Sequence, residues 1–557
     1  MGARSRKSQG RKEGGKTFGG GRAKPDEAAA RPESRTLLWT AGLLLLGLFT
    51  VYSLNPNYLV VTDTMANVHQ PLNMLHGNMT FTADSHPFMF KWKPANNDNR
   101  RIDINAWTPE VRKQYEAGAI KLVGPEYYLV ESRMPGRYVN FFGIGAALTA
   151  LPVYAVLEQF VPVLADHQKL MYFTCRELGA ALVAFSALFV FLTAVALTER
   201  RYALIIALAY GMGTCVWSTC SQGLWQQSPN VFFLAMGMCL FVRIERSWWL
   251  AAPCAAAWAM AVWCRPTSAI VVVCAAVWLA LRDRRALAVY LLAGLPFAAL
   301  MVLYNHHYLG SPFAFGQVEG ARTLAAQKTG VAEVWQTPLL QGLLGLLLSP
   351  ARGLFVFSPF LLLAIPGMVR VWKIEKLAAM RPLLVAVLLI LCVEARHFDW
   401  WGGWSYGYRH VLDLTVFMSL LLIPAFETFW HRNGFRGIFA AALLWSVVAQ
   451  IIGVAVYDVT GWDNRKAVAV TMKDRPRPVI VLEESDARAM GKDPAFVKAS
   501  GVKLNVDKPD FHRRLWSIKD SPLVYYVTHF SESRKQRTAC CQRFLPELFG
   551  GGAAPAP

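Results

Sequence analysis

Eleven apolar stretches recur along the chain, and they limit its fold more than any other feature of the sequence. They occupy residues 37–54, 178–198, 202–221, 229–242, 248–264, 266–281, 286–303, 353–369, 382–393, 411–426 and 437–457. A helix that crosses a bilayer needs about 20 apolar residues, so the shorter stretches would extend into their flanking loops. Only 17% of the residues are charged, whereas soluble domains carry about a quarter. We therefore predict an all-α polytopic membrane protein with about 11 transmembrane helices and additional juxtamembrane helices.

The distribution of positive charge indicates how these helices are oriented. The chain has 57 Lys and Arg against 37 Asp and Glu, an excess that would also suit nucleic-acid binding. The excess lies, however, in the amino-terminal tail and in every second short loop, which is typical of the cytoplasmic face of a membrane protein. These loops follow residues 198, 242, 281, 369 and 426. We therefore expect no nucleic-acid partner and a multi-pass protein of the cell (inner) membrane, with the amino terminus cytoplasmic and the carboxyl terminus extracytoplasmic.

This orientation requires that the apolar stretch 141–161 does not cross the membrane, and we interpret it as a juxtamembrane or re-entrant helix. The polar and aromatic segments then face the same outer side. They are the large first loop 55–175, the loop around Trp225, residues 305–352, residues 397–410 and everything after Tyr457.

Three regions follow from this division of the chain. Residues 1–36 are rich in Gly, Arg, Lys and Ser and predict a disordered basic cytoplasmic tail. Residues 37–457 form the transmembrane core. Residues 458–557 predict a small extracytoplasmic α+β segment, with β-prone runs at 478–482 and 523–528. The ten cysteines are scattered without zinc-ligand spacing and predict neither a metal site nor a disulfide framework.

The first outer loop contains the candidate catalytic residue, Asp63. It lies about nine residues after the first apolar stretch, close to the expected membrane surface. A carboxylate at this depth can accept a proton from a hydroxyl group or ligate a divalent ion while a lipid-borne substrate approaches from the bilayer. The alternative is a solvated loop residue, which is the usual role of a single Asp.

A second cluster, at residues 397–410, combines glycines, aromatic residues and cations. Its candidate substrate-binding residues are Trp404, Tyr406, Arg409 and His410. Aromatic rings offer flat faces to a sugar or prenyl chain, and a guanidinium group can donate two parallel hydrogen bonds to a phosphate. The alternative is an aromatic belt at the membrane interface with an Arg that reaches the headgroups.

Other outer segments supply further candidates for substrate binding. Trp225 and Gln226 lie in a short polar loop, and Asn305 ends an apolar stretch. Arg352 stands at the start of another apolar stretch, where an unpaired cation is costly and a phosphate partner would compensate it. A polar turn and an Arg in contact with lipid headgroups are the respective alternatives.

Residues 37–457 resemble the GT-C class of glycosyltransferases that use polyprenyl-phosphate-linked sugars, because these motifs follow one another in the same order. The most similar members are bacterial relatives of the dolichyl-phosphate-mannose protein mannosyltransferases and of the lipid A aminoarabinose transferases. The resemblance rests on Asp63 and residues 71–77, then on 136–137, 143–152, 222–229, 310–312, 349–353 and 401–409. Many members have two adjacent acidic residues in the first loop, whereas here Thr64 follows Asp63 and the next acid is Asp84.

The resemblance implies an inverting transfer of a sugar from a polyprenyl-phosphate donor to a lipid, glycan or protein acceptor on the outer side of the membrane. Asp63 would be the general base or a metal ligand, and Arg352 and Arg409 would bind the phosphate. No organic cofactor is implied, and the requirement for a divalent metal stays open. Apart from these substrates, the expected partners are the membrane lipids.

Two other classes of protein are consistent with the sequence. A transporter or flippase of a lipid-linked saccharide would also use aromatic and cationic residues in a cavity, but it favours ionisable groups at mid-span and interrupted helices. A scaffold for envelope assembly would have no use for Asp63 and the aromatic cluster.

Overall fold

The computed structural model describes residues 27–55, 62–96, 101–104, 107–161, 163–458, 461–474, 478–481, 488–493 and 495–542. Of the predicted disordered tail, residues 1–26 lie outside this part of the chain. Residues 27–36 begin helix α1 (Glu27–Ser53). The sequence at 28–30 is alanine-rich, and alanine is the strongest helix former. Residues 1–43 and 44–557 form two compact units, and every site discussed below belongs to the second.

Each of the eleven predicted apolar stretches is helical in the structure. Besides α1, the corresponding elements are α5 (Gln168–Leu197), α6 (Arg200–Gly213) with α7 (Cys215–Ser218) and η3 (Cys220–Gln222), α8 (Gln227–Phe241), α9 (Ala251–Cys264), α10 (Ala269–Arg282), α11 (Arg284–Leu309), α14 (Leu354–Phe357) with η6 (Pro359–Ala364) and α15 (Ile365–Arg370), α16 (Arg381–Arg396), η8 (Arg409–Leu414) with α17 (Thr415–Leu420) and α18 (Ile423–Phe429), and α19 (Asn433–Val456). The predicted juxtamembrane stretch forms α4 (Gly145–Phe160), whose 16 residues fall short of a typical span.

Among the described residues, six helices are long and apolar enough to cross a membrane, which is the pattern of a multi-pass membrane protein. A seventh crossing results if α6 and the segment Cys215–Gln222, which bend by 43° at Thr214, count as one span. The remaining predicted stretches form shorter or broken helices, so eleven full-length spans are not confirmed. Proline contributes to the breaks: Pro266 and Pro359 each begin a short 3-10 helix.

The first loop contains strands that the sequence did not predict. After α2 (Thr62–Leu75), strand β1 (Phe90–Pro94) pairs antiparallel with β2 (Ile120–Pro125), and β3 (Leu129–Glu131) pairs with β4 (Tyr138–Asn140). The short helix α3 (Pro109–Glu116) precedes β2. The strands enclose an aromatic core that includes Phe81, Phe90, Trp92 and Tyr128. This core fixes the residues that surround α2.

The carboxy-terminal segment is an α+β unit, as predicted. Strand β5 (Asn464–Met472) lies between β6 (Val479–Val481) and β7 (Phe496–Asn505), followed by η9 (Pro509–Trp516), α21 (Pro522–Thr528) and α22 (Phe530–Gln542). The predicted strand at 478–482 is confirmed over β6. The strand predicted at 523–528 is wrong, because Ser521 caps a helix there by accepting a hydrogen bond from the Val524 amide, and Pro522 occupies its first turn.

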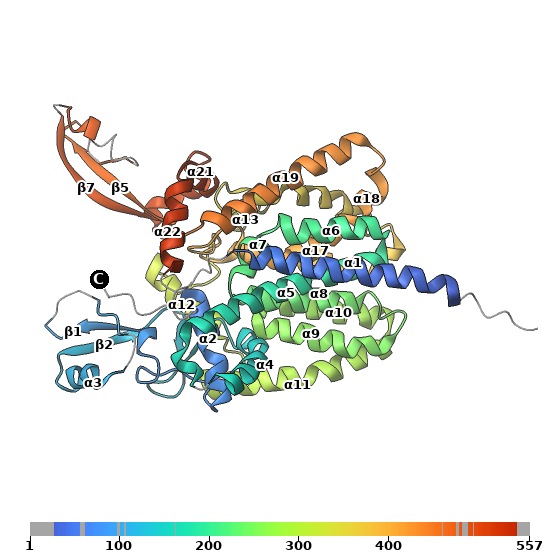
Figure 1. Cartoon of the computed structure of the whole chain (residues 1–557), viewed down its shortest axis with the longest axis horizontal. Coiled ribbons are helices and arrows are strands. Elements are labelled where there is room, and N and C mark those ends of the chain that lie inside the picture. Colours follow the sequence, from blue (N-terminus) through green and yellow to red (C-terminus); the bar gives the residue numbers. More distant parts are fainter. Residues whose placement is uncertain are drawn as a thin grey trace, which may run out of the picture. The chain divides into compact units, whose positions relative to one another are not determined.

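The polar elements of residues 44–557 gather at one end of the helical bundle, on the left of the view in Figure 1. Strands β1 and β2 of the first loop lie there, together with β5, β7, α21 and α22 of the carboxy-terminal segment. Helix α12 (Gly316–Thr329), from the segment between α11 and α13 (Leu339–Leu348), lies between these two groups. The candidate residues from five separate segments therefore have the opportunity to meet at this end.

Candidate active site

Asp63 forms an ion pair with Arg409, although 346 positions separate the two residues. Asp63 lies in the first turn of α2, where the helix dipole favours a negative charge, and it is 8% exposed. Its second oxygen accepts a hydrogen bond from the hydroxyl of Tyr127. Burial, and after it the Asp63 carboxylate, raises the pKa of Tyr127 well above its usual value. The phenol therefore stays protonated and acts as a donor.

Arg409 occupies the first position of η8, directly after the glycine-rich turn of residues 402–407. Gly402, Gly403 and Gly407 adopt φ angles of 75°, 60° and 68°, which side chains other than hydrogen disfavour. The turn directs the guanidinium group of Arg409 over the ring of Trp225, with 5.3 Å from its carbon to the ring centre. Such a cation–π contact stabilises a partly desolvated Arg. The structure thus brings together three of the predicted site residues: Asp63, Arg409 and Trp225.

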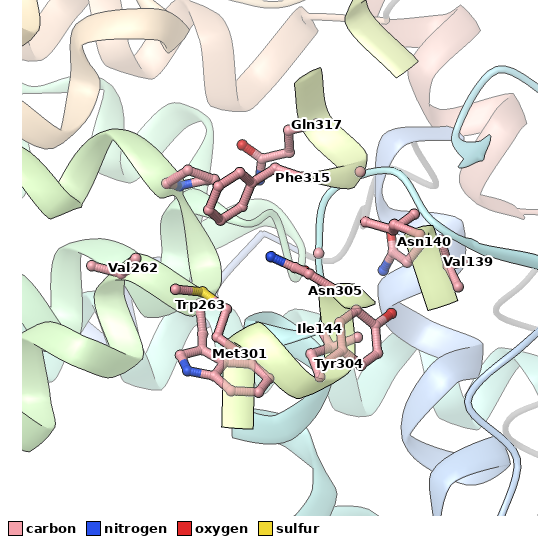
Figure 2. A pocket seen from close by; sticks show the side chains of 14 residues that line it. Val139, Asn140, Ile144, Val262, Trp263, Met301, Tyr304, Asn305, Phe315 and Gln317 are labelled. Atoms are coloured by element: carbon pink, nitrogen blue, oxygen red, sulfur yellow. The ribbon is translucent and has the colours of Figure 1, made fainter. Parts of the chain in front are cut away.

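Gln226, which follows Trp225, contacts Gln317, one of the residues that line a neighbouring pocket. Its side-chain oxygen accepts a hydrogen bond of 2.6 Å from Gln317, at the start of α12. Gln317 also donates to the Cys264 carbonyl at 3.1 Å, which ties α12 to the end of α9. Asn305 projects into this pocket from α11, between Trp263 and Gln317 (Figure 2). Asn305 therefore lines a separate pocket, which neither Asp63 nor Arg409 lines.

An apolar groove continues from this pocket along α9, α10 and α11. It offers about 450 Å³ of space and is lined by small and aliphatic side chains such as Ala259, Val273 and Leu295. The groove and the pocket of Asn305 share Val262, Trp263 and Met301. An apolar chain in the groove would therefore reach this pocket.

His410, next to Arg409, points away from Asp63 into a buried ionic network. Its Nδ1 atom lies 2.7 Å from the Glu394 carboxylate, and its ring lies 5.0 Å from that of His397. Burial lowers the pKa of His397 to about 4, so this ring is uncharged at neutral pH.

Trp404 belongs to the interface between the 397–410 loop and the carboxy-terminal segment. Its indole nitrogen donates to the side chain of Asn505 at 3.0 Å, close to the point where Lys328 bridges Asp399 and Asp507 at 2.9 and 3.0 Å. Burial alone would raise the pKa of the Asp399 carboxyl, but the Lys328 ammonium group and the nearby His410 lower it to about 2. The carboxy-terminal segment therefore closes one side of the loop that carries Arg409.

Arg352 lies outside this cluster and is 1% exposed. It forms an ion pair with Asp463, and all three of its side-chain nitrogens donate hydrogen bonds to carbonyl oxygens, those of Ala351, Trp401 and Gly403. The structure thus assigns this guanidinium group to the anchoring of the carboxy-terminal segment, and it offers no open face to a phosphate.

Tyr406 is likewise a packing residue. Its hydroxyl donates to the Ala449 carbonyl at 2.6 Å, and its ring packs against Phe357 and Tyr457. It therefore joins the aromatic loop to α19 rather than to the Asp63–Arg409 pair.

Two residues near the site were not among the predicted candidates: Tyr127, in the turn between β2 and β3, and Lys328, in the last turn of α12. Gln317 lies in the outer segment 305–352, but no local pattern distinguished it from its neighbours. In the part of the chain that the structure describes, no group of three or more His, Cys, Asp or Glu residues is arranged to hold a metal ion.

Comparison with known proteins adds nothing to this geometry: no family model matches the chain, and neither does any curated protein. The interpretation of the site therefore rests on its own residues.

Proposed function

We propose that the protein is a membrane-embedded glycosyltransferase of the GT-C class, which transfers a sugar from a polyprenyl-phosphate donor to an acceptor on the outer side of the membrane. The observation that carries the proposal is the contact between Asp63 and Arg409, together with an apolar groove that joins the neighbouring pocket of Asn305 and Gln317. The Asp63 carboxylate can accept a proton, the Arg409 guanidinium group can bind a phosphate, and the groove can hold a lipid chain.

The ion pair represents the resting state of the proposed enzyme. When the donor binds, its phosphate competes for the guanidinium group of Arg409, which can donate two parallel hydrogen bonds to it. Asp63 then loses its cationic partner, and its carboxylate can accept the proton of the acceptor hydroxyl while the hydroxyl of Tyr127 keeps it oriented.

The reaction is a single displacement that inverts the sugar. Asp63 accepts the proton of the acceptor hydroxyl, whose oxygen forms a bond to the anomeric carbon. The bond from that carbon to the phosphate oxygen breaks at the same time, and Arg409 stabilises the polyprenyl phosphate that leaves.

The groove along α9, α10 and α11 is the proposed site of the prenyl chain. Its apolar lining replaces lipid contacts at little cost, and the residues that it shares with the pocket of Asn305 lead towards Gln317 and Gln226. The carrier would thus remain in the bilayer while its phosphate reaches the site.

The proposed topology has eleven crossings, a cytoplasmic amino terminus and an extracytoplasmic carboxyl terminus in the cell membrane. Short or broken helices would complete their spans with flanking loop residues. The basic loops between the apolar stretches support this orientation, as does the gathering of polar elements at one end of the bundle.

Substitution of Asp63 by Asn tests the proposal. The amide keeps the size of the carboxylate but cannot accept the proton, so we expect sugar transfer to fall by about 10²- to 10⁴-fold. The assay uses membranes with matched amounts of protein and a polyprenyl-phosphate sugar. Asp84→Asn, which removes an exposed acid of the same loop, is the matched control and should retain activity. Normal transfer by the Asp63 variant would reject the mechanism.

A flippase for a lipid-linked saccharide is the second candidate, and the 43° bend between α6 and α7 favours it. The buried acids Glu394 and Asp413 lie close to the ends of their helical segments rather than at mid-span, which favours the enzyme. Reconstituted vesicles separate the two candidates: a flippase moves the labelled lipid between leaflets without an acceptor, whereas the transferase forms a glycosylated product.

A further inference from the structure

A buried arginine, Arg265, joins three segments of the helical core behind the Asp63–Arg409 pair. It follows the last residue of α9 and is 6% exposed. One terminal nitrogen of its guanidinium group lies 2.8 Å from a Glu394 oxygen at the end of α16, and the other forms an ion pair with Asp413 in η8. The latter nitrogen also donates to the main-chain oxygen of His410 at 3.2 Å.

Glu394 completes the network by holding the side chain of His410. One of its oxygens bonds Arg265, and the other accepts a hydrogen bond from Nδ1 of the His410 ring at 2.7 Å. His410 is therefore fixed twice, at its main-chain oxygen by Arg265 and at its ring by Glu394.

These contacts bear directly on the placement of Arg409. His410 and Asp413 both belong to η8, whose first residue is Arg409. The glycines at 402, 403 and 407 permit many conformations in the turn that precedes it, so the turn alone does not define the position of Arg409. The anchors at His410 and Asp413 supply the missing constraint.

Burying these charged groups has a high free-energy cost if their role is only to hold a short helix. Desolvation of buried charges costs several kcal/mol per ion, and well-packed apolar side chains are often as stable or more stable. Stability alone therefore does not account for an arginine, two carboxylates and an imidazole at this place, whereas a need for exact placement of the adjacent guanidinium group does.

We propose that Arg265 and Glu394 are positioning residues, which act through His410 to hold Arg409 opposite Asp63. The effect on catalysis rests on the proposed transferase function, but the effect on the position of residue 409 does not. The two statements are tested by separate measurements.

The first measurement reports the position of residue 409 without any enzymatic assay. In an Arg409→Lys variant, a water-soluble carbodiimide condenses the Lys amine with the Asp63 carboxylate if the two are in contact. Peptide mass spectrometry then quantifies the cross-link. We expect the Arg409→Lys protein to form it, and added Glu394→Gln to reduce its yield by about 10-fold.

Glu375→Gln is the matched control, because Glu375 also bonds two arginines, Arg282 and Arg381, at 2.8 and 2.9 Å, but is exposed. It should leave the yield unchanged. His410→Asn, which spares the contacts of Arg265 with both acids, is the second variant and should also lower the yield. Absence of the cross-link in Arg409→Lys itself, or an equal yield after Glu394→Gln and His410→Asn, would overturn the proposal.

The second measurement is a double-mutant cycle on sugar transfer. If Glu394 acts through Arg409, Glu394→Gln raises the donor KM by about 10-fold in the native background and has no further effect in Arg409→Ala. Multiplicative losses would show an independent role and overturn the positioning role. A reduced cross-link together with normal transfer by Asp63→Asn would instead reject the transferase mechanism and leave the positioning network standing.

Discussion

Arg409 and Arg352 each pair with an aspartate from a distant segment, but their surroundings differ. Arg409 meets Asp63 with its side chain 16% exposed, and its guanidinium group lies over the ring of Trp225. Arg352 meets Asp463 at 1% and 0% exposure, and the guanidinium group donates to three carbonyl oxygens as well. We refer to these regions as the Asp63 site and the Arg352 anchor.

The difference shows which of two similar ion pairs is available for chemistry. A phosphate can displace Asp63 from Arg409, because the exchange replaces one anion by another at an accessible face. The same exchange at Arg352 would leave the Asp463 carboxylate buried without its cation, which is costly. Burial raises the pKa of Asp463 to about 6 despite the neighbouring guanidinium group, which indicates how unfavourable the charge is there.

The largest effect is expected from Arg352→Met in the anchor. The variant leaves a buried carboxylate unpaired and should lower the free energy of unfolding by about 3 to 5 kcal/mol. Denaturant unfolding of the purified protein in detergent measures it. The double variant Arg352→Met with Asp463→Leu removes both charges and should recover most of the loss. A raised donor KM with unchanged stability would instead assign Arg352 to substrate binding.

Arg409→Ala should act on the donor and much less on the fold. Loss of hydrogen bonds to a charged group predicts an increase of about 10- to 100-fold in the KM for the polyprenyl-phosphate sugar. Arg322→Ala removes an exposed arginine of α12 that pairs with Glu319, and it serves as the control. An unchanged donor KM in the Arg409 variant would remove the distinction between site and anchor.

The free energy of unfolding should depend on pH with opposite slopes for the Asp63 site and the Arg352 anchor. Burial, and then His86, lowers the pKa of His69, on the same helix as Asp63, to about 3. The unfolded chain takes up this proton near pH 6.5 and the folded chain does not, so stability is lost as the pH falls below 6.5. We expect the native protein to lose roughly 1.5 kcal/mol more than His69→Phe between pH 6.5 and 5.

Asp463 predicts the opposite slope, since its raised pKa lets the folded anchor hold a proton that the unfolded chain has released between about pH 4 and 6. Thermal unfolding of the native protein and of His69→Phe across this range separates the two contributions. The variant lacks the contribution of His69 and keeps that of Asp463. Parallel pH profiles would show that His69 is not buried in its neutral form.

The smallest effect is expected from Trp404→Phe, at the contact between the 397–410 loop and the carboxy-terminal segment. The variant loses the hydrogen bond to Asn505 and should reduce stability by about 1 kcal/mol. Hydrogen exchange of residues 464–505 should increase, while the acceptor KM stays unchanged. A strong increase in the acceptor KM would place Trp404 among the substrate-binding residues.

The sequence alone predicted the helical membrane class of the protein and a part of its site. Long apolar stretches determine helices locally, because a backbone in lipid must satisfy its own hydrogen bonds. Asp63, Arg409 and Trp225 stood out for the same local reason, as a charge or an indole group within about ten residues of an apolar stretch. At 523–528, the β-prone composition predicted a strand, but the residues form a helix that Ser521 caps.

Only the tertiary structure decided which candidates meet. Tyr127, Arg265, Glu394 and Lys328 derive their significance from partners in distant segments, 148 positions away for Arg265 with Asp413 and further for Lys328 with Asp507. Likewise, the sequence contexts of Arg352 and Arg409 are alike, and only packing made one a closed anchor and the other an open pair. Hydropathy is a property of neighbouring residues, whereas the burial and pairing of a charge depend on every segment that the fold brings to it.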